Sequence, residues 1–195
     1  MRVFVAAHLT PAVQEALAAV QDRLRRADGD VSWVKPGNLH ATVKFLGEIE
    51  PARLGRIQAA VAEAVRPHVP FEMEVAGIGT FGGRVPRVVW VGITRGVEPL
   101  TALAHDVEAA LARIGFPKEQ RGFTAHLTVG RVRSSRNLDR LMAGIGVEPA
   151  LALGVVPVEA IVVMQSELHP SGSIYTELAQ CALGRSGGVE ETPCE

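Results

Sequence analysis

The apolar residues of the chain form short and long runs, which predict strands and helices. Short runs that are continuously apolar, or that alternate with polar residues, have the period of a strand. Six of them lie at residues 3–7, 31–34, 71–75, 88–93, 159–165 and 174–183. Two further strand-like runs, N-L-H-A-T-V-K-F-L-G from Asn38 and F-T-A-H-L-T-V-G-R from Phe123, have a sequence pattern of their own.

Three longer stretches place apolar residues three and four positions apart, the spacing of one helical face. These predicted helices run from Pro11 to about Asp28, from Pro51 to Pro67 and from Pro99 to Gly115. Each begins with a proline, which is favoured at the first helical position, and Thr10 supplies a capping hydroxyl to the first helix. The mixture of helices and strands predicts the α+β class.

Two of the predicted strands share the pattern histidine, apolar, threonine, apolar. The first contains His40 and Thr42, and the second contains His126 and Thr128, 86 residues later. Successive side chains of a strand point to opposite faces. Each histidine should therefore share a face with its threonine, while the apolar residues between and beyond them enter a core.

The pattern belongs to a larger repeat of strand, proline-led helix and His-x-Thr strand. From Val3 to His40 is 37 residues, and from Val89 to His126 is also 37 residues. Equal order and spacing indicate two similar lobes related by a pseudo-two-fold axis. Such an axis would bring the two equivalent strands, and their histidines, together.

Two imidazoles and two hydroxyls in one cleft suit phosphoryl chemistry without a metal. Imidazole titrates near neutral pH, so one ring can accept a proton while the other donates one. Threonine hydroxyls and nearby arginines can bind the oxygens of the phosphate. The arrangement predicts general acid–base attack by water on a phosphodiester. For a cyclic diester, one histidine that activates water and one that protonates the departing oxygen are nearly sufficient.

The composition limits the number of domains and the classes of function, and it is compatible with this prediction. The chain has 195 residues, so one domain is expected. Its formal net charge of −1 gives no reason to expect a nucleic-acid binder. The segment 113–140 is the exception, with seven basic residues against two acidic ones around the second motif. Two cysteines, no signal peptide and no long apolar run predict a cytoplasmic protein without a disulfide framework.

Both elements, N-L-H-A-T-V-K-F-L-G and A-H-L-T-V-G-R, closely resemble the two signature motifs of the 2H phosphoesterases. Within that superfamily the chain is similar to the RNA 2',3'-cyclic phosphodiesterases, also called LigT-like proteins or 2'-5' RNA ligases. Supporting stretches are M-R-V-F-V-A, W-V-K-P-G-N-L-H, P-R-V-V-W-V-G and S-G-S-I-Y-T-E-L. The resemblance implies a bilobal fold, with two pseudo-symmetric antiparallel sheets, outer helices and a central cleft. We expect one such domain over residues 1–184 and a disordered tail over residues 185–195.

The resemblance also implies a role for each motif residue. His40 would donate a proton to the leaving 3' oxygen, His126 would activate water, and the product would be a 2'-phosphomonoester. Thr42 and Thr128 would bind the phosphate, and so would Arg131. Arg131 lies three residues after Thr128, so a regular strand would turn it to the opposite face. Its role requires a strand end or a bulge.

The implied partner is RNA with a 2',3'-cyclic phosphate end, with tRNA fragments among the candidates. No cofactor, metal or membrane is expected, and a monomer is expected. Reverse 2'-5' ligation is an accompanying activity that the family name implies. Two alternatives remain: a phosphodiesterase for small cyclic nucleotides, and a non-catalytic RNA-binding module that uses the arginine-rich face.

Other sequence features give weaker indications of function. Gly77, Gly79 and Gly82 form a G-x-G-x-x-G pattern, but it leads into a strand rather than a helix, so a turn is expected instead of a dinucleotide site. The candidates for stacking on a base are Trp33, Phe45 and Tyr175, whereas Trp90, flanked by valines, is expected in the core. The other four histidines, His8, His68, His105 and His169, are expected to be incidental.

Overall fold

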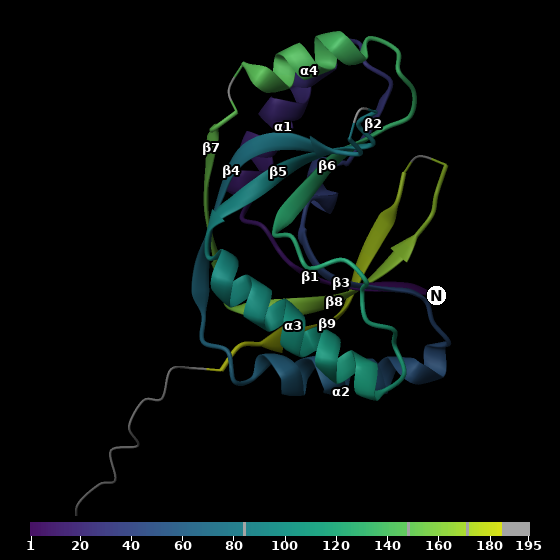
Figure 1. Ribbon diagram of the computed structural model, residues 1–195. Helices are drawn as coiled ribbons and strands as arrows, with labels where there is room; N and C mark the ends of the chain where they lie inside the picture. Colours follow the sequence, from purple (N-terminus) through teal and green to yellow (C-terminus); the bar gives the residue numbers. More distant parts are fainter. Residues whose placement is uncertain (84, 148, 171, 185–195) are drawn as a thin grey trace, which may run out of the picture.

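The computed structural model describes residues 1–83, 85–147, 149–170 and 172–184, and its architecture is α+β (Figure 1). The strands are β1 (Arg2–Ala7), β2 (Val31–Trp33), β3 (Ala41–Glu48), β4 (Phe71–Phe81), β5 (Val88–Arg95), β6 (His126–Val132), β7 (Ala152–Val158), β8 (Ala160–Glu167) and β9 (Ile174–Ala182). The α-helices are α1 (Pro11–Arg25), α2 (Leu54–Val65), α3 (Val97–Arg113) and α4 (Leu138–Gly146), and two short 3-10 helices are η1 (Pro36–Asn38) and η2 (Pro51–Arg53).

The strands form two antiparallel groups that meet along β3 and β6. The order of neighbours is β7-β4-β5-β6-β3-β1-β8-β9, with β2 added beside β6. One registered pair, Ala41 opposite Leu127, joins β3 to β6. The predicted bilobal arrangement of two antiparallel sheets is confirmed, and the two His-x-Thr strands form the seam between them.

The helices tie the two groups together. Helix α1 follows β1 of one group but packs against β7 in the other, and α3 connects β5 to β6 but contacts β3. Helix α2 packs beside α3 and covers β9, while α4 lies over α1 at the far end of the molecule (Figure 1). Each connecting helix therefore crosses the seam.

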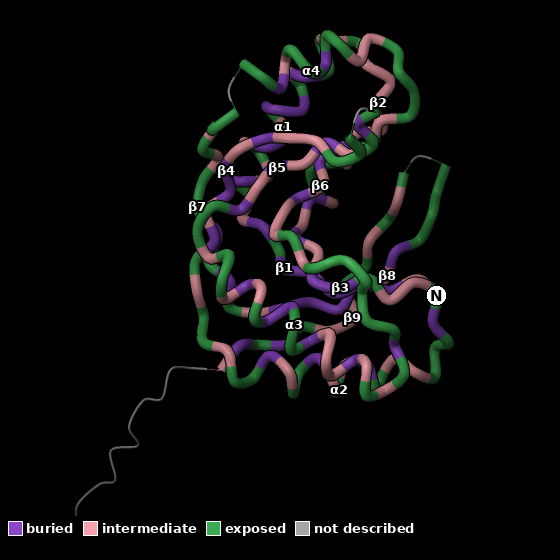
Figure 2. Tube along the Cα trace, viewed as in Figure 1, coloured by how far each residue is buried: buried purple, intermediate pink, exposed green. Residues whose placement is uncertain are grey.

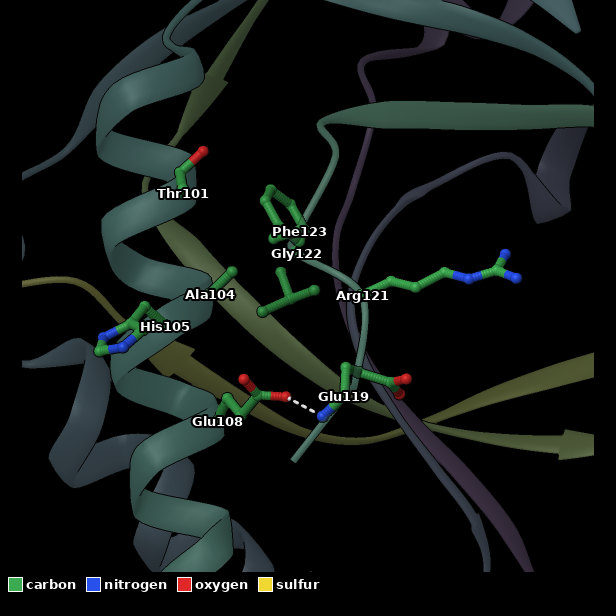
Figure 3. Close-up of a pocket in the computed structure, with 9 residues that line it drawn as sticks. Thr101, Ala104, His105, Glu108, Glu119, Arg121, Gly122 and Phe123 are labelled. Carbon is green, nitrogen blue, oxygen red and sulfur yellow. Dashed lines mark hydrogen bonds between the residues drawn. The ribbon is translucent and has the colours of Figure 1, made fainter. Parts of the chain in front are cut away.

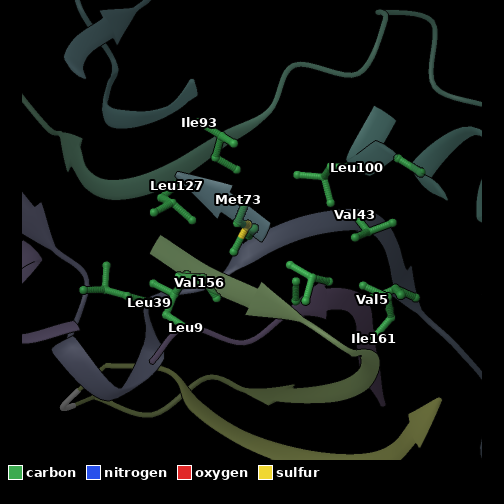
Figure 4. Close-up of a cluster of buried hydrophobic side chains, with 14 of the residues drawn as sticks. Val5, Leu9, Leu39, Val43, Met73, Ile93, Leu100, Leu127, Val156 and Ile161 are labelled. Carbon is green, nitrogen blue, oxygen red and sulfur yellow. The ribbon is translucent and has the colours of Figure 1, made fainter. Parts of the chain in front are cut away.

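A hydrophobic core runs across the seam as one continuous cluster (Figure 4). Val5 and Ile161 enter it from one group of strands, Met73 and Leu127 from the other, and Leu100 from α3, all of them almost completely buried. Burying a side chain of this size stabilises the fold by about 1.5–3 kcal/mol. Buried backbone segments concentrate along the strands, whereas the outer turns of the helices are exposed (Figure 2).

Most predicted elements appear where the hydrophobic pattern placed them. The Thr10 hydroxyl accepts a hydrogen bond from the Val13 amide at 3.4 Å, which confirms the expected cap of α1. Helix α4 and strand β7 were not predicted. Strand β4 is also longer than expected, because it continues through Gly77 and Gly79, and only Gly82 lies in the turn. The expected tail, residues 185–195, lies outside the described residues.

Within the described part of the chain, no helix combines the length and the apolar character needed to cross a membrane.

Candidate active site

The register of β3 and β6 determines how the two motifs face each other. Ala41 and Leu127, the central residues of the two motifs, pair directly and are both buried. The histidines and threonines on either side of them therefore project together from the opposite face. Extending this register by one residue, to His40 just before β3, would set His40 opposite Thr128 and make His40 and His126 diagonal neighbours, whose Cα atoms in a regular antiparallel pair lie about 7–8 Å apart.

The two imidazoles are held by equivalent hydrogen bonds. Nδ1 of His40 lies 2.7 Å from the carbonyl oxygen of Asn38, and Nδ1 of His126 lies 2.7 Å from the carbonyl oxygen of Thr124. A carbonyl only accepts, so Nδ1 must carry a proton and donate it in both residues. Nε2 is then the nitrogen of each ring that can exchange a proton with a substrate.

His40 lies in an aromatic enclosure. Its ring stacks on Phe4, with centroids 4.7 Å apart, and meets Tyr175 edge-on at 5.4 Å. Burial lowers the pKa of His40 because it penalises the imidazolium, and the nearby charge of His8 lowers it further, while the bond to the Asn38 carbonyl acts in the opposite direction. The free protein therefore favours the neutral form of His40.

His126 borders a different, apolar pocket of about 310 Å³. Its ring meets Phe81 edge-on at 5.0 Å, and Phe81 stacks on Trp90 at 5.2 Å. The expectation that Trp90 lies in the core is wrong. Val89 and Val91 are fully buried, so the alternation of β5 turns Trp90 to the other face, into this pocket. A Cβ on Gly79 would come within 2.5 Å of the indole, so Gly79 makes room for Trp90.

Both motif strands contain a bulge at the equivalent position. Along β1, the partner in β3 steps from Lys44 to Thr42, and along β5, the partner in β6 steps from Gly130 to Thr128. The unpaired residues are Val43 and Val129, which both remain buried. An extra residue reverses the alternation of the strand beyond it.

The bulges bring two further side chains to the face of the motif. Arg131 is exposed and lines a pocket of about 400 Å³ together with Asn38 and Tyr175, which both contact His40. Phe45, its equivalent in β3, is 44% exposed and stacks on Phe4. The bulge that the role of Arg131 requires is therefore present in β6.

The structure thus pairs the two strands that carry the predicted histidines and threonines, and it places Arg131 in the pocket that Asn38 and Tyr175 also line. The stacking candidates also lie near the site: Trp33 and Tyr175 line the pocket that contains Arg131, and Phe45 reaches His40 through Phe4.

Two residues near the site were not predicted from the sequence. His8, expected to be incidental, pairs its Nε2 with a Glu177 carboxylate oxygen at 2.8 Å and acts on the pKa of His40. Gln21 is fully buried on α1, and its side-chain amide donates to the carbonyls of Val34 and Val129, each at 2.8 Å. The sequence places Gln21, a polar residue, on the buried face of an amphipathic helix, and that position is the signal from which its role could have been predicted.

A third pocket, of about 370 Å³, lies between α3 and the segment before β6, and it contains neither motif histidine (Figure 3). Nearby, the buried amine of Lys44 bonds Glu108 at 2.8 Å and the Pro117 carbonyl at 3.0 Å, which fixes that segment to the helix. Among the described residues, no group of three or more His, Cys, Asp and Glu side chains could hold a metal ion. Burial raises the pKa of the Cys181 thiol, which makes it a poor nucleophile.

Comparison with known proteins reproduces the internal repeat. The sequence model of the family described as LigT-like phosphoesterase matches this chain twice, at residues 8–90 and 91–175. Each match contains one His-x-Thr element. The two halves are therefore similar to the same family pattern, as the equal spacing predicted.

Similar proteins cover almost the whole chain. A protein of Methanothermobacter thermautotrophicus named RNA 2',3'-cyclic phosphodiesterase is 36% identical over 179 residues, which are 91% of this chain and 96% of that protein. A protein of the same name from Thermotoga maritima is 29% identical and covers 97% of this chain and 98% of its own.

Solved structures show the same fold. A crystal structure of a Thermus thermophilus protein superposes with a TM-score of 0.80 at 28% identity, covering 96% of this chain and all of that one (100%). Apo LigT of E. coli superposes with a TM-score of 0.75 at 23% identity, covering 94% and 98% of the two chains.

Proposed function

The chain belongs to the LigT-like phosphoesterase family, and from this premise we propose that it hydrolyses RNA 2',3'-cyclic phosphates to 2'-phosphomonoesters. The observation that carries the proposal is the pair of His-x-Thr strands meeting at Ala41 and Leu127, with both histidines bonded alike through Nδ1. Relatives named RNA 2',3'-cyclic phosphodiesterase support the substrate class.

In the proposed reaction, water attacks phosphorus opposite the 3' oxygen. Nε2 of His126 accepts a proton from the water as the new P–O bond forms. The P–O bond to the 3' oxygen breaks, and Nε2 of protonated His40 donates its proton to that oxygen. The products are a 3' hydroxyl and a 2' phosphate, and the two histidines exchange protonation states in each turnover.

Thr42, Thr128 and Arg131 are proposed to hold the phosphate between the imidazoles. Hydroxyls donate to the non-bridging oxygens, and the guanidinium stabilises the negative charge that accumulates there during attack. The bulge at Val129 supports the role of Arg131, because it turns that side chain toward the pocket beside His40.

The lowered pKa of His40 is compatible with its role as proton donor. In the free protein, burial disfavours the imidazolium. A bound phosphate anion beside the ring favours it and raises the pKa of His40. Substrate binding would therefore protonate His40 at the moment when its proton is needed.

The wider setting is proposed on the same basis. We assign the activity to a cytoplasmic monomer that acts on RNA ends such as those of tRNA fragments, with reverse 2'-5' ligation as a minor direction. In ligation, the 5' hydroxyl of a second RNA occupies the position of the attacking water and gives its proton to His126.

The test is the conversion of a short RNA that ends in a 2',3'-cyclic phosphate, in the presence of EDTA. The proposal predicts a 2'-phosphate end and an unchanged rate with the chelator. A 3'-phosphate end would contradict the assignment of the broken bond. Salt-sensitive binding without conversion would favour a non-catalytic RNA-binding module instead.

A further inference from the structure

The pockets on the two sides of the motif strands differ sharply in charge. The pocket beside His40 is lined by Lys35, Arg131 and Arg133, and no aspartate or glutamate is among its described lining residues. None of the described residues that line the pocket beside His126 is Asp, Glu, Lys or Arg. A polyanion is therefore attracted to one side of the reaction centre only.

The three cations are available to a ligand. Lys35, Arg131 and Arg133 are exposed, and across the described ranges none of them forms an ion pair. The only hydrogen bond of these side chains is from the Arg133 guanidinium to the Ser32 hydroxyl, at 3.1 Å, within the described residues. Their charge is thus not neutralised by carboxylates of the described fold.

Their positions are set by the elements around them. Lys35 precedes η1 and reaches the opposite wall, where a Cβ placed on Gly172 would lie 3.7 Å from its Nζ. The same two walls are joined by the Asn38 amide, which donates to the Ser173 carbonyl at 2.7 Å. Arg133 lies one residue beyond the end of β6 and follows Arg131 by two residues, a step of about 6.8 Å in extended chain.

This step suits the backbone of a single RNA strand, whose phosphates follow one another at similar intervals. Arg131 is already engaged with the reacting phosphate in the proposed function. Arg133 lies two residues beyond Arg131 on the side away from His126, where the next phosphate of the strand would lie, and Lys35, just before η1, lines the same pocket.

We propose that Lys35 and Arg133 bind the phosphate on the 5' side of the terminal nucleotide, so that the RNA chain leaves the site through the pocket beside His40. This assignment rests on the proposed function and specifies its substrate: an RNA end with a 5' phosphate or a preceding nucleotide, in preference to an unphosphorylated cyclic mononucleotide.

The assignment predicts a substrate preference of defined origin. A charged hydrogen bond to phosphate should raise kcat/KM by roughly tenfold. The advantage should weaken with salt, because each phosphate contact on a single strand contributes about −0.7 to the slope of log K against log salt concentration.

The experiment compares two substrates that differ only in this phosphate: adenosine 2',3'-cyclic phosphate with a 5' hydroxyl and with a 5' phosphate. For each protein, the measured quantity is the ratio of kcat/KM with the 5' phosphate to kcat/KM with the 5' hydroxyl. The proteins are wild type, Lys35→Ala, Arg133→Ala and, as a matched control, Arg56→Ala on the exposed face of α2.

We expect a ratio of roughly ten for wild type and Arg56→Ala, and a ratio that falls toward one in Lys35→Ala and Arg133→Ala. A wild-type ratio near one, with both substrates turned over, would overturn this inference and leave the proposed function intact. A ratio that is high and equal in all four proteins would also overturn it. Turnover of neither substrate, nor of a longer RNA, would overturn both.

Discussion

At the scale of single residues, the two imidazoles are bonded alike but lie in different surroundings. Each donates through Nδ1 to the carbonyl two residues earlier, which fixes the same tautomer in both. His40 is enclosed by Phe4 and Tyr175, whereas His126 borders an apolar pocket beside Phe81. The shared bond suits both rings for proton transfer, and the differing surroundings allow them opposite roles.

Replacement of the bridging 3' oxygen by sulfur should separate these roles. A thiolate leaves without protonation, so His40→Ala should lose roughly 10²–10⁴-fold in kcat on the oxygen substrate and much less on the sulfur substrate. His126→Ala should lose a similar factor on both, because the attacking water still needs a base. If sulfur restores His126→Ala instead, the acid and the base are interchanged. Single-turnover rates on the paired substrates measure the effect.

The dependence of kcat/KM on pH should show the effect of the aromatic enclosure on the pKa of His40. As the proton donor, His40 must be protonated, so kcat/KM falls as pH rises through its pKa in the free enzyme. Burial lowers that pKa, which places this limb below 6.5. Tyr175→Ala admits water, should raise the pKa, and should move the falling limb to higher pH.

The matched control for that shift is Tyr175→Phe, which keeps the ring against His40 and should leave the limb where it is in wild type. A limb that stays in place in Tyr175→Ala, or moves to lower pH, would show that burial does not set this pKa.

At the scale of elements, the bulges in β3 and β6 organise the site, and each lies beside a buried polar contact from a crossing helix. Gln21 of α1 binds the carbonyl of Val129, the bulged residue of β6. Lys44, next to the bulge of β3, binds Glu108 of α3. The helices therefore add side-chain contacts at the irregular positions, beyond those that strand pairing supplies.

Gln21→Met tests this support, since methionine keeps the volume but cannot donate. The Val34 carbonyl would lose its bond, and we expect about 1–3 kcal/mol less stability in urea denaturation. The catalytic rate well below the unfolding midpoint should also fall, because the bulge positions Thr128 and Arg131. Gln58→Met, which removes a comparable bond to Leu178 outside the site, should lose stability without losing rate. Equal rates in both variants would argue against the positioning role of Gln21.

The sequence predicted those elements whose signals are local. A capping hydroxyl and proline define the start of α1, and the His-x-Thr pattern defines the exposed faces of β3 and β6. A bulge is a property of two paired strands. The sequence of β6 therefore showed that Arg131 needs a bulge to reach the site, but it could not show at which residue the bulge lies. Helix α4 begins after Asn137 in the left-handed conformation with no capping side chain, and β7 contains Gly154 and Pro157, so both lack the usual signals.

At the scale of the whole molecule, two similar halves share the proposed active site and a hydrophobic cluster that runs across the seam. The strand groups are joined through one registered pair between β3 and β6, but α1 and α3 cross the seam and the buried cluster is continuous. The pseudo-two-fold arrangement therefore makes the site depend on the integrity of the entire fold.

We accordingly predict that the chain unfolds as a single cooperative domain. Fluorescence of Trp33 and Trp90 reports on β2 and β5, while far-ultraviolet circular dichroism reports largely on the helices, which include α2 and α3. The two signals should give coincident urea transitions. Separate midpoints would mean that the lobes fold independently.

The central claim is that the two motif histidines form one acid–base pair for a cyclic phosphate. The most direct measurement is the conversion of a short RNA 2',3'-cyclic phosphate by wild type, His40→Ala, His126→Ala and the exposed control His105→Ala, all verified as folded. The account predicts a 2'-phosphate product, losses of roughly 10²–10⁴-fold in kcat for each motif variant, and a wild-type rate for the control. Undiminished conversion by either motif variant would contradict it.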